Sequence, residues 1–290
     1  MGYNQHQSFY LRDRWLGKAI RSIETNPSFF FEKDAFEKIG LGKNMVQSLR
    51  HWIKAIGIVD EDRIKKVHTL TPLGKLIKKY DITLKYVATA AILHYEITKQ
   101  DEPSTAWYWF FNELKDTQIS REDLLVTFQS WVQSRETRVV SENSLKRDVD
   151  TLIRMYTAGE DNEDPEEVTL SPLANLQVMT EKNGIVYKEE AIIPKQDEIF
   201  LMYVLLDYSQ RKEQYVLNID DLLQETGLFG NIYNWSRANI LRMLNDWTYE
   251  DEFKIVFTRT NNLDVIRVPE VDPIDFLETQ YKNKENEEKW

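Results

Sequence analysis

The chain has 290 residues, of which 42% are hydrophobic and 12% aromatic, so it can fold around more than one core. It contains no cysteine, which excludes disulfides, thiolate catalysis and cysteine-type zinc sites. No apolar run reaches the roughly 18 residues that a membrane span needs, and the N-terminus lacks the pattern of a secretory signal. We therefore expect a cytoplasmic protein with no membrane contact.

The formal net charge is −11, but the charge is unevenly distributed along the chain. Residues 11–79 carry 15 basic and 8 acidic side chains, whereas the rest of the chain carries 22 basic and 40 acidic ones. A local basic excess is typical of a surface that meets nucleic acid. We interpret the acidic remainder mainly as a source of solubility. The alternative is that it faces a basic partner protein or repels DNA.

Residues 29–79 have the pattern of a winged helix-turn-helix. A short helix over residues 34–40 precedes a tight turn at residues 41–44 and a second helix over residues 45–56. The apolar residues of the second helix recur at three- and four-residue spacing, and a charged, hairpin-like segment follows it. In such a module the second helix lies in the major groove of DNA.

The polar side of this second helix carries residue types that bind DNA. Arginine can donate two hydrogen bonds to guanine, asparagine and glutamine can pair with adenine, and lysine suits phosphates. We predict DNA contacts from this helix and the following hairpin at Lys43, Asn44, Gln47, Arg50, His51, Lys54, Lys65, Lys66 and His68. The alternative is an ordinary solvated surface on a protein-interaction module.

Residues 82–119 form an aromatic connector after this first unit. The pattern predicts a helix over residues 84–98, a break at Pro103 and another helix from Ser104. We interpret the aromatic cluster as core packing; the alternative is a platform on which bases stack.

The segment Leu70-Thr-Pro-Leu recurs 100 residues later as Leu170-Ser-Pro-Leu. In the first copy, Thr71 is placed as the N-cap of a helix and Pro72 as its first residue. A helix rich in basic and amide residues precedes both copies, and an acidic stretch intervenes. The order favours a second winged-helix-like unit over residues 120–195.

Within this second unit, Ser120 and Asp123 resemble a capping box that begins a helix reaching about Gln133. Another helix is predicted over residues 141–155. Its side chains Asn143, Lys146 and Arg147 are weaker DNA candidates, because salt bridges of Asp148 and Asp150 are the simpler explanation of its mixed charges. We interpret the acidic residues 160–167 as a solvated loop, since the glycine and spacing of a calcium loop are lacking.

Residues 196–273 form a third winged-helix-like unit in the predicted organisation. The expected elements are helices over residues 198–208, 219–225 and 236–247, with Ser236 as a cap, and strands over residues 253–259 and 263–268 about a turn at 260–262. The charged tail, residues 274–290, is expected to fray. The fold class is thus mainly α with small β-hairpin wings, in tandem winged helix-turn-helix-like units joined by a helical layer; residues 1–81 form the first unit.

The sequence carries no strong catalytic or cofactor motif. Asp246, Glu252 and Lys254 loosely match a metal-nuclease pattern, and we interpret the match as chance. Phosphate-binding loops and the hydrolase nucleophile elbow are absent, so no cofactor is evident. Mg²⁺ or Mn²⁺ enters only if the protein nicks DNA.

An ordered set of motifs spans the chain. Its N-terminal part is His6, Phe9, Arg12, Trp15 and Lys18, and further motifs lie at residues 42–45, 70–74, 107–112, 144–150, 171–173 and 197–200. With these motifs the chain resembles a prokaryotic family known as domain of unknown function 4007. The resemblance implies a genomic association with phosphosulfate reductase-like sulfur-transfer enzymes of DNA phosphorothioation and anti-phage defence. One relative in a single-strand phosphorothioation system is regarded as a DNA-nicking component.

The N-terminal motif has two interpretations. It can form a phosphate or DNA-end pocket in which His6 acts as an acid, base or donor. We favour instead a structural clamp with Trp15 in the core and Arg12 paired with a carboxylate.

Three functions remain open at this stage. The leading hypothesis is a DNA-binding subunit of a phosphorothioation-type defence system, which presents DNA to sulfur-transfer partners and assists or performs nicking. The second is a winged-helix transcriptional regulator that binds an operator as a homodimer, and the third is a non-catalytic protein scaffold.

Overall fold

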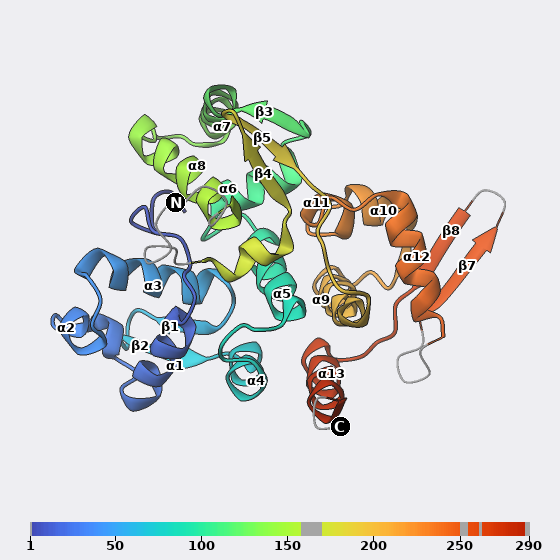
Figure 1. Cartoon of the computed structure of the whole chain (residues 1–290), viewed down its shortest axis with the longest axis horizontal. Coiled ribbons are helices and arrows are strands. Elements are labelled where there is room, and N and C mark those ends of the chain that lie inside the picture. The colour runs from blue at the N-terminus through green and yellow to red at the C-terminus, as the bar shows by residue number, and fades with distance from the viewer. Residues whose placement is uncertain (1, 158–169, 250–254, 261–262, 288–290) are drawn as a thin grey trace.

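A computed structural model describes residues 2–157, 170–249, 255–260 and 263–287. The protein is mainly helical, and the described residues form three small antiparallel sheets. The units surround a central helix, α5 (Val87–Thr98), as Figure 1 shows. This helix is buried almost all round, which agrees with a sequence that lacks a polar face. In the described residues we find no helix with both the length and the apolar character of a membrane span.

The first unit contains the helices and the hairpin in the predicted order. Its elements are α1 (Trp15–Thr25), η1 (Phe29–Phe31), α2 (Ala35–Ile39), α3 (Lys43–Ala55), β1 (Val59–Asp62), β2 (Val67–Leu70) and α4 (Pro72–Tyr80). Gly40 ends α2 in the left-handed conformation, with φ of 67°, which allows the sharp turn into α3. The predicted N-cap of α4 is confirmed, because the Thr71 hydroxyl accepts from the Gly74 amide and Pro72 is the first helical residue.

The second and third units share a strand order that the sequence did not reveal. The second contains β3 (Gln118–Ser120), α7 (Arg121–Arg135), α8 (Glu142–Thr157), η3 (Pro172–Leu176), β4 (Met179–Lys182) and β5 (Ile185–Lys188). The third contains η4 (Lys195–Leu201), α9 (Met202–Lys212), β6 (Val216–Asn218), α10 (Ile219–Gln224), α11 (Phe229–Ile232), α12 (Arg237–Trp247), β7 (Val256–Thr260) and β8 (Leu263–Arg267). In each sheet the first strand pairs with the last, giving the orders β3-β5-β4 and β6-β8-β7.

The predicted caps of these units are present. Ser120 accepts from the Asp123 amide at the start of α7, and Ser236 from the Asn239 amide at the start of α12. The repeated Ser-Pro-Leu segment forms the short 3₁₀ helix η3 after its cap Ser171, in contrast to the α-helix α4 that follows Thr71.

The aromatic connector forms core, as predicted. It folds into α6 (Thr105–Tyr108) and the π-helical turn η2 (Trp109–Glu113). The rings of Trp107, Trp109, Phe110 and Phe111 are at most 2% exposed, so bases cannot stack on them in this conformation.

The expectation that the tail frays is wrong for the part that the structure describes. Residues Pro273–Glu287 form α13, which packs against α4 and α9. Phe276, Leu277 and Tyr281 lie on one face of this helix and are buried, and the Tyr281 hydroxyl lies 2.8 Å from that of Thr89. Burial of this apolar face stabilises the helix despite its many charged residues.

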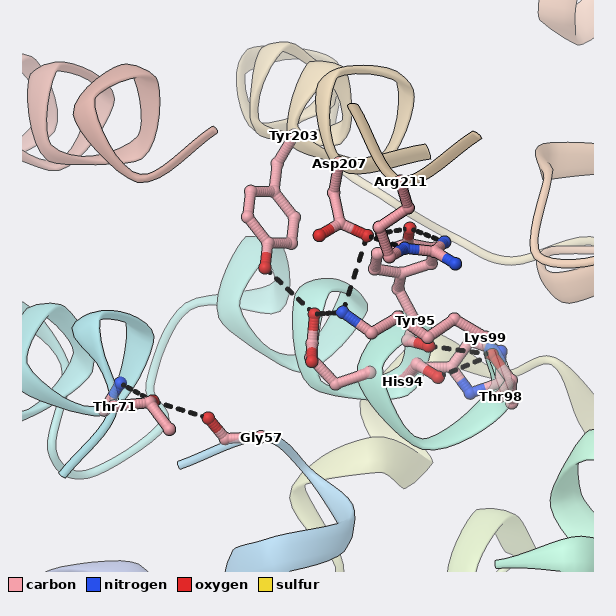
Figure 2. A network of polar contacts seen from close by, with 11 residues as sticks. Gly57, Thr71, His94, Tyr95, Thr98, Lys99, Tyr203, Asp207 and Arg211 are labelled. Carbon is pink, nitrogen blue, oxygen red and sulfur yellow. Dashed lines mark hydrogen bonds and ion pairs between the residues drawn. The ribbon is translucent and has the colours of Figure 1, made fainter. Parts of the chain in front are cut away.

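A buried polar network attaches the third unit to the central helix (Figure 2). Lys99, the residue that follows α5, lies 2.7 Å from the Glu96 carboxylate and 3.4 Å from that of Asp207 in α9. The Tyr203 hydroxyl donates to Glu96, and Arg211 donates to Asp207. Because charges in a low-dielectric interior need partners, this network favours a single arrangement of α5 and α9.

Candidate nucleic-acid interface

The N-terminal part of α3 presents three of the predicted DNA-contact residues to solvent. Lys43, Asn44 and Gln47 are exposed, and Gly42 places the start of the helix in an extended N-cap conformation. The opposite side of α3 packs into the core through Leu49, among other residues. The amphipathic pattern thus fixes which side of the helix is available to a ligand.

A single carboxylate gathers the cations farther along α3. Arg50 Nε and Arg63 Nε each lie 2.7 Å from a Glu61 oxygen, and Lys54 Nζ lies at 3.1 Å. The His68 Nε2 atom lies 3.2 Å from the same carboxylate. The Glu61 side chain is only 3% exposed. We call Arg50, Lys54, Glu61 and Arg63 the Glu61 cluster.

The Glu61 cluster fixes both the charge of its carboxylate and the position of Arg50. Burial raises the pKa of Glu61, but hydrogen bonds from Arg63, Arg50 and Lys54 outweigh it and lower the pKa to about 2. The Arg50 guanidinium also lies 4.0 Å from the centre of the Phe31 ring. Arg50 is therefore held in place rather than free to search for a guanine edge.

Sequence reasoning overlooked Glu61, although strand alternation contains a signal for it. Glu61 lies two residues after the buried Val59 in β1, so both side chains belong to the same face of the strand. A carboxylate on the buried face, opposite a helix rich in cations, indicates an internal ion-pair partner.

The expectation that His51 and His68 face solvent is wrong. His51 is 8% exposed and His68 1%. The Ser104 hydroxyl lies 3.4 Å from His51 Nε2, and the His6 ring centre lies 6.1 Å from that of His51. Burial lowers the pKa of His51 well below its usual value, so this ring is neutral near pH 7. Contacts from segments distant in the sequence, which periodicity cannot reveal, cover both rings.

The tip of the β1–β2 hairpin carries the other exposed cations. Lys65 and Lys66 are exposed, and Lys66 is in the left-handed conformation with φ of 55°. The Asp62 carboxylate accepts from the Ile64 amide at 3.0 Å and the Lys65 amide at 2.9 Å, which fixes the turn. Ile64 between them is 95% exposed. The tip therefore presents charge and one apolar side chain to solvent.

The N-terminal segment, residues 2–14, clamps the first unit to the second. His6 is 1% exposed, and its Nε2 atom lies 2.6 Å from the Asp148 carboxylate of α8. The same carboxylate oxygen accepts from the Asn4 amide at 2.8 Å, and the Ser8 amide donates to His6 Nδ1. Both ring nitrogens are thus engaged inside the protein. This arrangement favours the clamp interpretation over an acid–base role for His6.

The remaining motif residues complete the clamp in a different way from the expected one. Trp15 is 4% exposed in the core, as the clamp interpretation requires. The Arg12 guanidinium has no carboxylate partner among the described residues and instead lies 5.5–5.6 Å from the ring centres of Phe9, Tyr10 and Trp15. Lys18 Nζ lies 3.4 Å from the Ile39 carbonyl. Cation–π contacts replace the expected ion pair.

A pocket of about 580 Å³ separates α3 from the N-terminal segment. We call it the α3 pocket. Its walls include Gln47, Arg50, His51 and Lys54 from α3 and Gln5 and Gln7 from the N-terminal segment, and the loop at residues 102–103 also borders it. The N-terminal trace lies between α3 and α8 in Figure 1. The polar side of α3 therefore faces a bounded space beyond its first turn.

The second unit uses its mixed charges internally, as the simpler interpretation predicted. Asp150 pairs with Arg121 at 3.2 Å and with Lys146 at 3.5 Å, while Asp148 belongs to the N-terminal clamp. Asn143 and Arg147 are exposed. These contacts explain the alternating signs in this helix without a ligand.

The proposed carboxylate pattern of the third unit does not form a metal centre in the described residues. Asp246 pairs with Lys195 at 3.1 Å and Arg242 at 3.7 Å. Glu252, Lys254 and the acidic residues 160–167 lie outside the described residues. In the described ranges, no three His, Asp or Glu side chains are grouped as metal ligands.

These observations define a mainly helical protein with small antiparallel sheets, in which one basic helix-and-hairpin face borders a pocket. The chain belongs to the family described as protein of unknown function (DUF4007), whose sequence profile matches residues 3–281. A search of curated protein sequences finds no significant match.

Two solved structures share the fold. A magnesium ion-bound SspB crystal structure matches with a TM-score of 0.87, and an SspB crystal structure matches with 0.85. Each is 20% identical in sequence, and each match covers 97% of this chain and 88% of the other. At this identity the likeness shows that the fold is shared.

Proposed function

We propose that the protein is a DNA-binding component of a DNA phosphorothioation-type modification or anti-phage defence system. The observation that carries the proposal is that five predicted DNA-contact side chains on α3 and the hairpin tip are exposed: Lys43, Asn44, Gln47, Lys65 and Lys66. They belong to the one strongly basic stretch of an acidic chain. Such a surface attracts the phosphates of an approaching duplex.

The winged-helix interpretation gives these residues their roles. The order α1-α2-α3-β1-β2 is that of a winged helix, with α3 as the recognition helix and the hairpin as the wing. Asn44 and Gln47 then reach base edges, while Lys43, Lys65 and Lys66 contact phosphates. The shared strand order of the second and third units supports a tandem array of such modules.

The assignment to a modification system rests on the family and on the shared fold of the structures named SspB. Sulfur-transfer enzymes of the phosphosulfate reductase type and other defence proteins are the proposed partners, in the cytoplasm. The acidic surface outside residues 11–79 is available for such partners, because it does not compete for DNA. A homodimer is compatible with this role.

Strand nicking is a secondary proposal, by this chain or by an enzyme to which it presents DNA. One of the two similar SspB structures is bound to a magnesium ion, which favours a test with Mg²⁺ or Mn²⁺. The described residues of this chain do not gather a three-residue metal site, so we assign no step to a metal.

Supercoiled plasmid incubated with the purified protein tests both proposals. We expect retarded plasmid at low salt, with binding weakened as salt rises because condensed counterions are released on binding. Open circles that form only with Mg²⁺ or Mn²⁺ would establish nicking. The absence of retardation at low salt would contradict the DNA-binding proposal and favour a protein scaffold.

Matched variants locate the DNA-binding surface, and a footprint tests the alternative of a transcriptional regulator. Lys43→Ala combined with Lys65→Ala should weaken retardation, whereas Lys182→Ala, an exposed lysine on β4, should not. A footprint confined to a palindromic site would favour the transcriptional regulator instead.

A further inference from the structure

The two main walls of the α3 pocket are fixed before any ligand binds. The N-terminal wall is held by Asp148, which accepts from the Asn4 amide and contacts His6 Nε2 at 2.6 Å. The same segment is attached to α3 because the Phe9 carbonyl accepts from Trp52 Nε1 at 2.8 Å. A ligand therefore enters a preformed space and does not have to order it.

The size of the pocket selects a small ligand over a duplex. Its volume of about 580 Å³ lies inside the range of sites that hold small molecules and cofactors. A recognition helix reads a duplex by lying along a major groove about 12 Å wide, which requires an open helix face. Gln5 and Gln7 of the N-terminal segment line the pocket together with residues of α3, so the polar side of α3 is not an open face here.

The chemistry of the walls matches the two halves of a nucleotide. Gln5 and Gln7 from the N-terminal segment and Gln47 from α3 line the pocket with amide groups, and each amide combines a donor with an acceptor, as base edges require. Three cations, Arg50, Lys54 and Arg63, line the same space with the carboxylates of Glu61 and Glu102, and Glu61 fixes the cations in place. Cations of this kind bind phosphate, and a fixed cation loses little freedom when it does so.

We propose that the α3 pocket binds one unpaired nucleotide of a DNA strand, with its base between the amides and its phosphate beside Arg50 and Lys54. The inference rests on the proposed DNA-binding function and adds the form of DNA that is recognised. Extruding a base from a duplex costs least where it is mismatched, bulged or single-stranded. The protein thus selects DNA that offers an unpaired base.

Fluorescent oligonucleotides test the selection with the full-length protein. One sequence is prepared as a perfect duplex, as a duplex with a single bulged 2-aminopurine, and as a single strand. Anisotropy should show the bulged and single-stranded forms bound about tenfold more tightly than the duplex, because no pairing is lost. The bulged 2-aminopurine should change its emission on binding, since its environment changes from water to the pocket.

Single replacements distinguish the pocket from the surface around it. Gln7→Ala should lower the preference for the bulge by about tenfold while duplex affinity changes less than about twofold, and Gln47→Ala, which also removes a proposed duplex contact, should weaken both forms. Lys43→Ala is the control, because Lys43 lies on α3 outside the pocket walls and contacts a phosphate in the proposed binding mode. This control should weaken all three DNA forms to a similar extent.

The outcomes separate failure of the pocket from failure of the proposed function. Equal affinity for all three DNA forms would overturn the pocket assignment and leave DNA binding intact. No binding to any form would overturn the DNA-binding function, and with it the strand assignment. Saturable binding of 2-aminopurine deoxyribonucleoside monophosphate, without preference among the oligonucleotides, would assign the pocket to a free nucleotide instead.

Discussion

The first and third units place similar elements in similar order but use their charges in opposite ways. In the first, residues 11–79 carry 15 basic and 8 acidic side chains; in the third, residues 196–273 carry 7 basic and 14 acidic ones. Both present a helix followed by a hairpin, α3 with β1–β2 and α12 with β7–β8. The local architecture therefore does not determine whether such a surface attracts nucleic acid.

The pairing of individual arginines explains the difference. In the third unit, Arg237 pairs with Asp220 and Asp264, and Arg242 pairs with Glu198. Each of these arginines meets at least one carboxylate, which leaves little positive field. In the first unit one carboxylate, Glu61, serves three cations, and exposed lysines add to the excess.

The largest expected effect concerns DNA affinity. Replacing Lys43, Lys65 and Lys66 by alanine should reduce the salt slope of DNA binding by about 3 and lower affinity on the order of 100-fold at low salt, because each phosphate contact releases about one counterion. The matched replacement of Arg237, Arg259 and Arg267 in the third unit should leave the slope unchanged. Anisotropy titrations across a salt series measure both. Equal effects of the two triples would erase the proposed contrast between the units.

The sequence was sufficient for the parts of the first unit that depend on local signals. The cap at Thr71, the turn between the first two helices and the amphipathic α3 all arise from neighbouring residues, and the predicted order of helices and hairpin is correct. The expected start of α3 at residue 45 was two residues late. Boundaries depend on a few hydrogen bonds and are the least certain feature of a periodic pattern.

The sequence was insufficient wherever partners come from far along the chain. The short strands β3 and β6 were not predicted, because their stability comes from pairing with β5 and β8 and not from their own composition. The burial of His51 depends on the N-terminal segment and Ser104 in the same way. The α3 pocket is formed by these distant contacts, so a pattern on α3 alone could not indicate it.

The second expected effect compares the loss of one cation from each unit. Arg242→Ala should lower the free energy of unfolding by about 2–3 kcal/mol, because Glu198 is 7% exposed and has no other cation partner in the described residues. Arg50→Ala should cost about 1 kcal/mol, because Glu61 retains Lys54 and Arg63. Urea denaturation monitored by tryptophan fluorescence gives both values. A larger cost for Arg50→Ala would contradict the shared-carboxylate description.

The third expected effect is a pH dependence of the first unit. The pKa of Glu61 is about 2 in the folded protein and about 4.3 in an unfolded chain. The lowered pKa means that the charged form stabilises the fold fully above about pH 5, and that this stabilisation is lost as pH falls toward 2. Glu61→Gln should therefore cost about 2 kcal/mol at pH 7. Its difference from the unaltered protein should shrink in urea titrations between pH 5 and pH 3, and a constant difference would exclude this role for Glu61.

The smallest expected effect is a gain in DNA affinity when a carboxylate that pairs with arginines of the third unit is removed. Asp264 pairs with both Arg237 and Arg259, so Asp264→Asn leaves two guanidinium groups with one fewer carboxylate. Both arginines are exposed and their ion pairs are therefore weak, so we expect DNA affinity to rise by no more than about threefold. Glu213→Gln is the control, since it removes one exposed charge and frees no arginine. A tenfold gain from Asp264→Asn alone would show that the third unit is a masked DNA-binding surface, and the two units would then differ only in the carboxylate that covers the arginines.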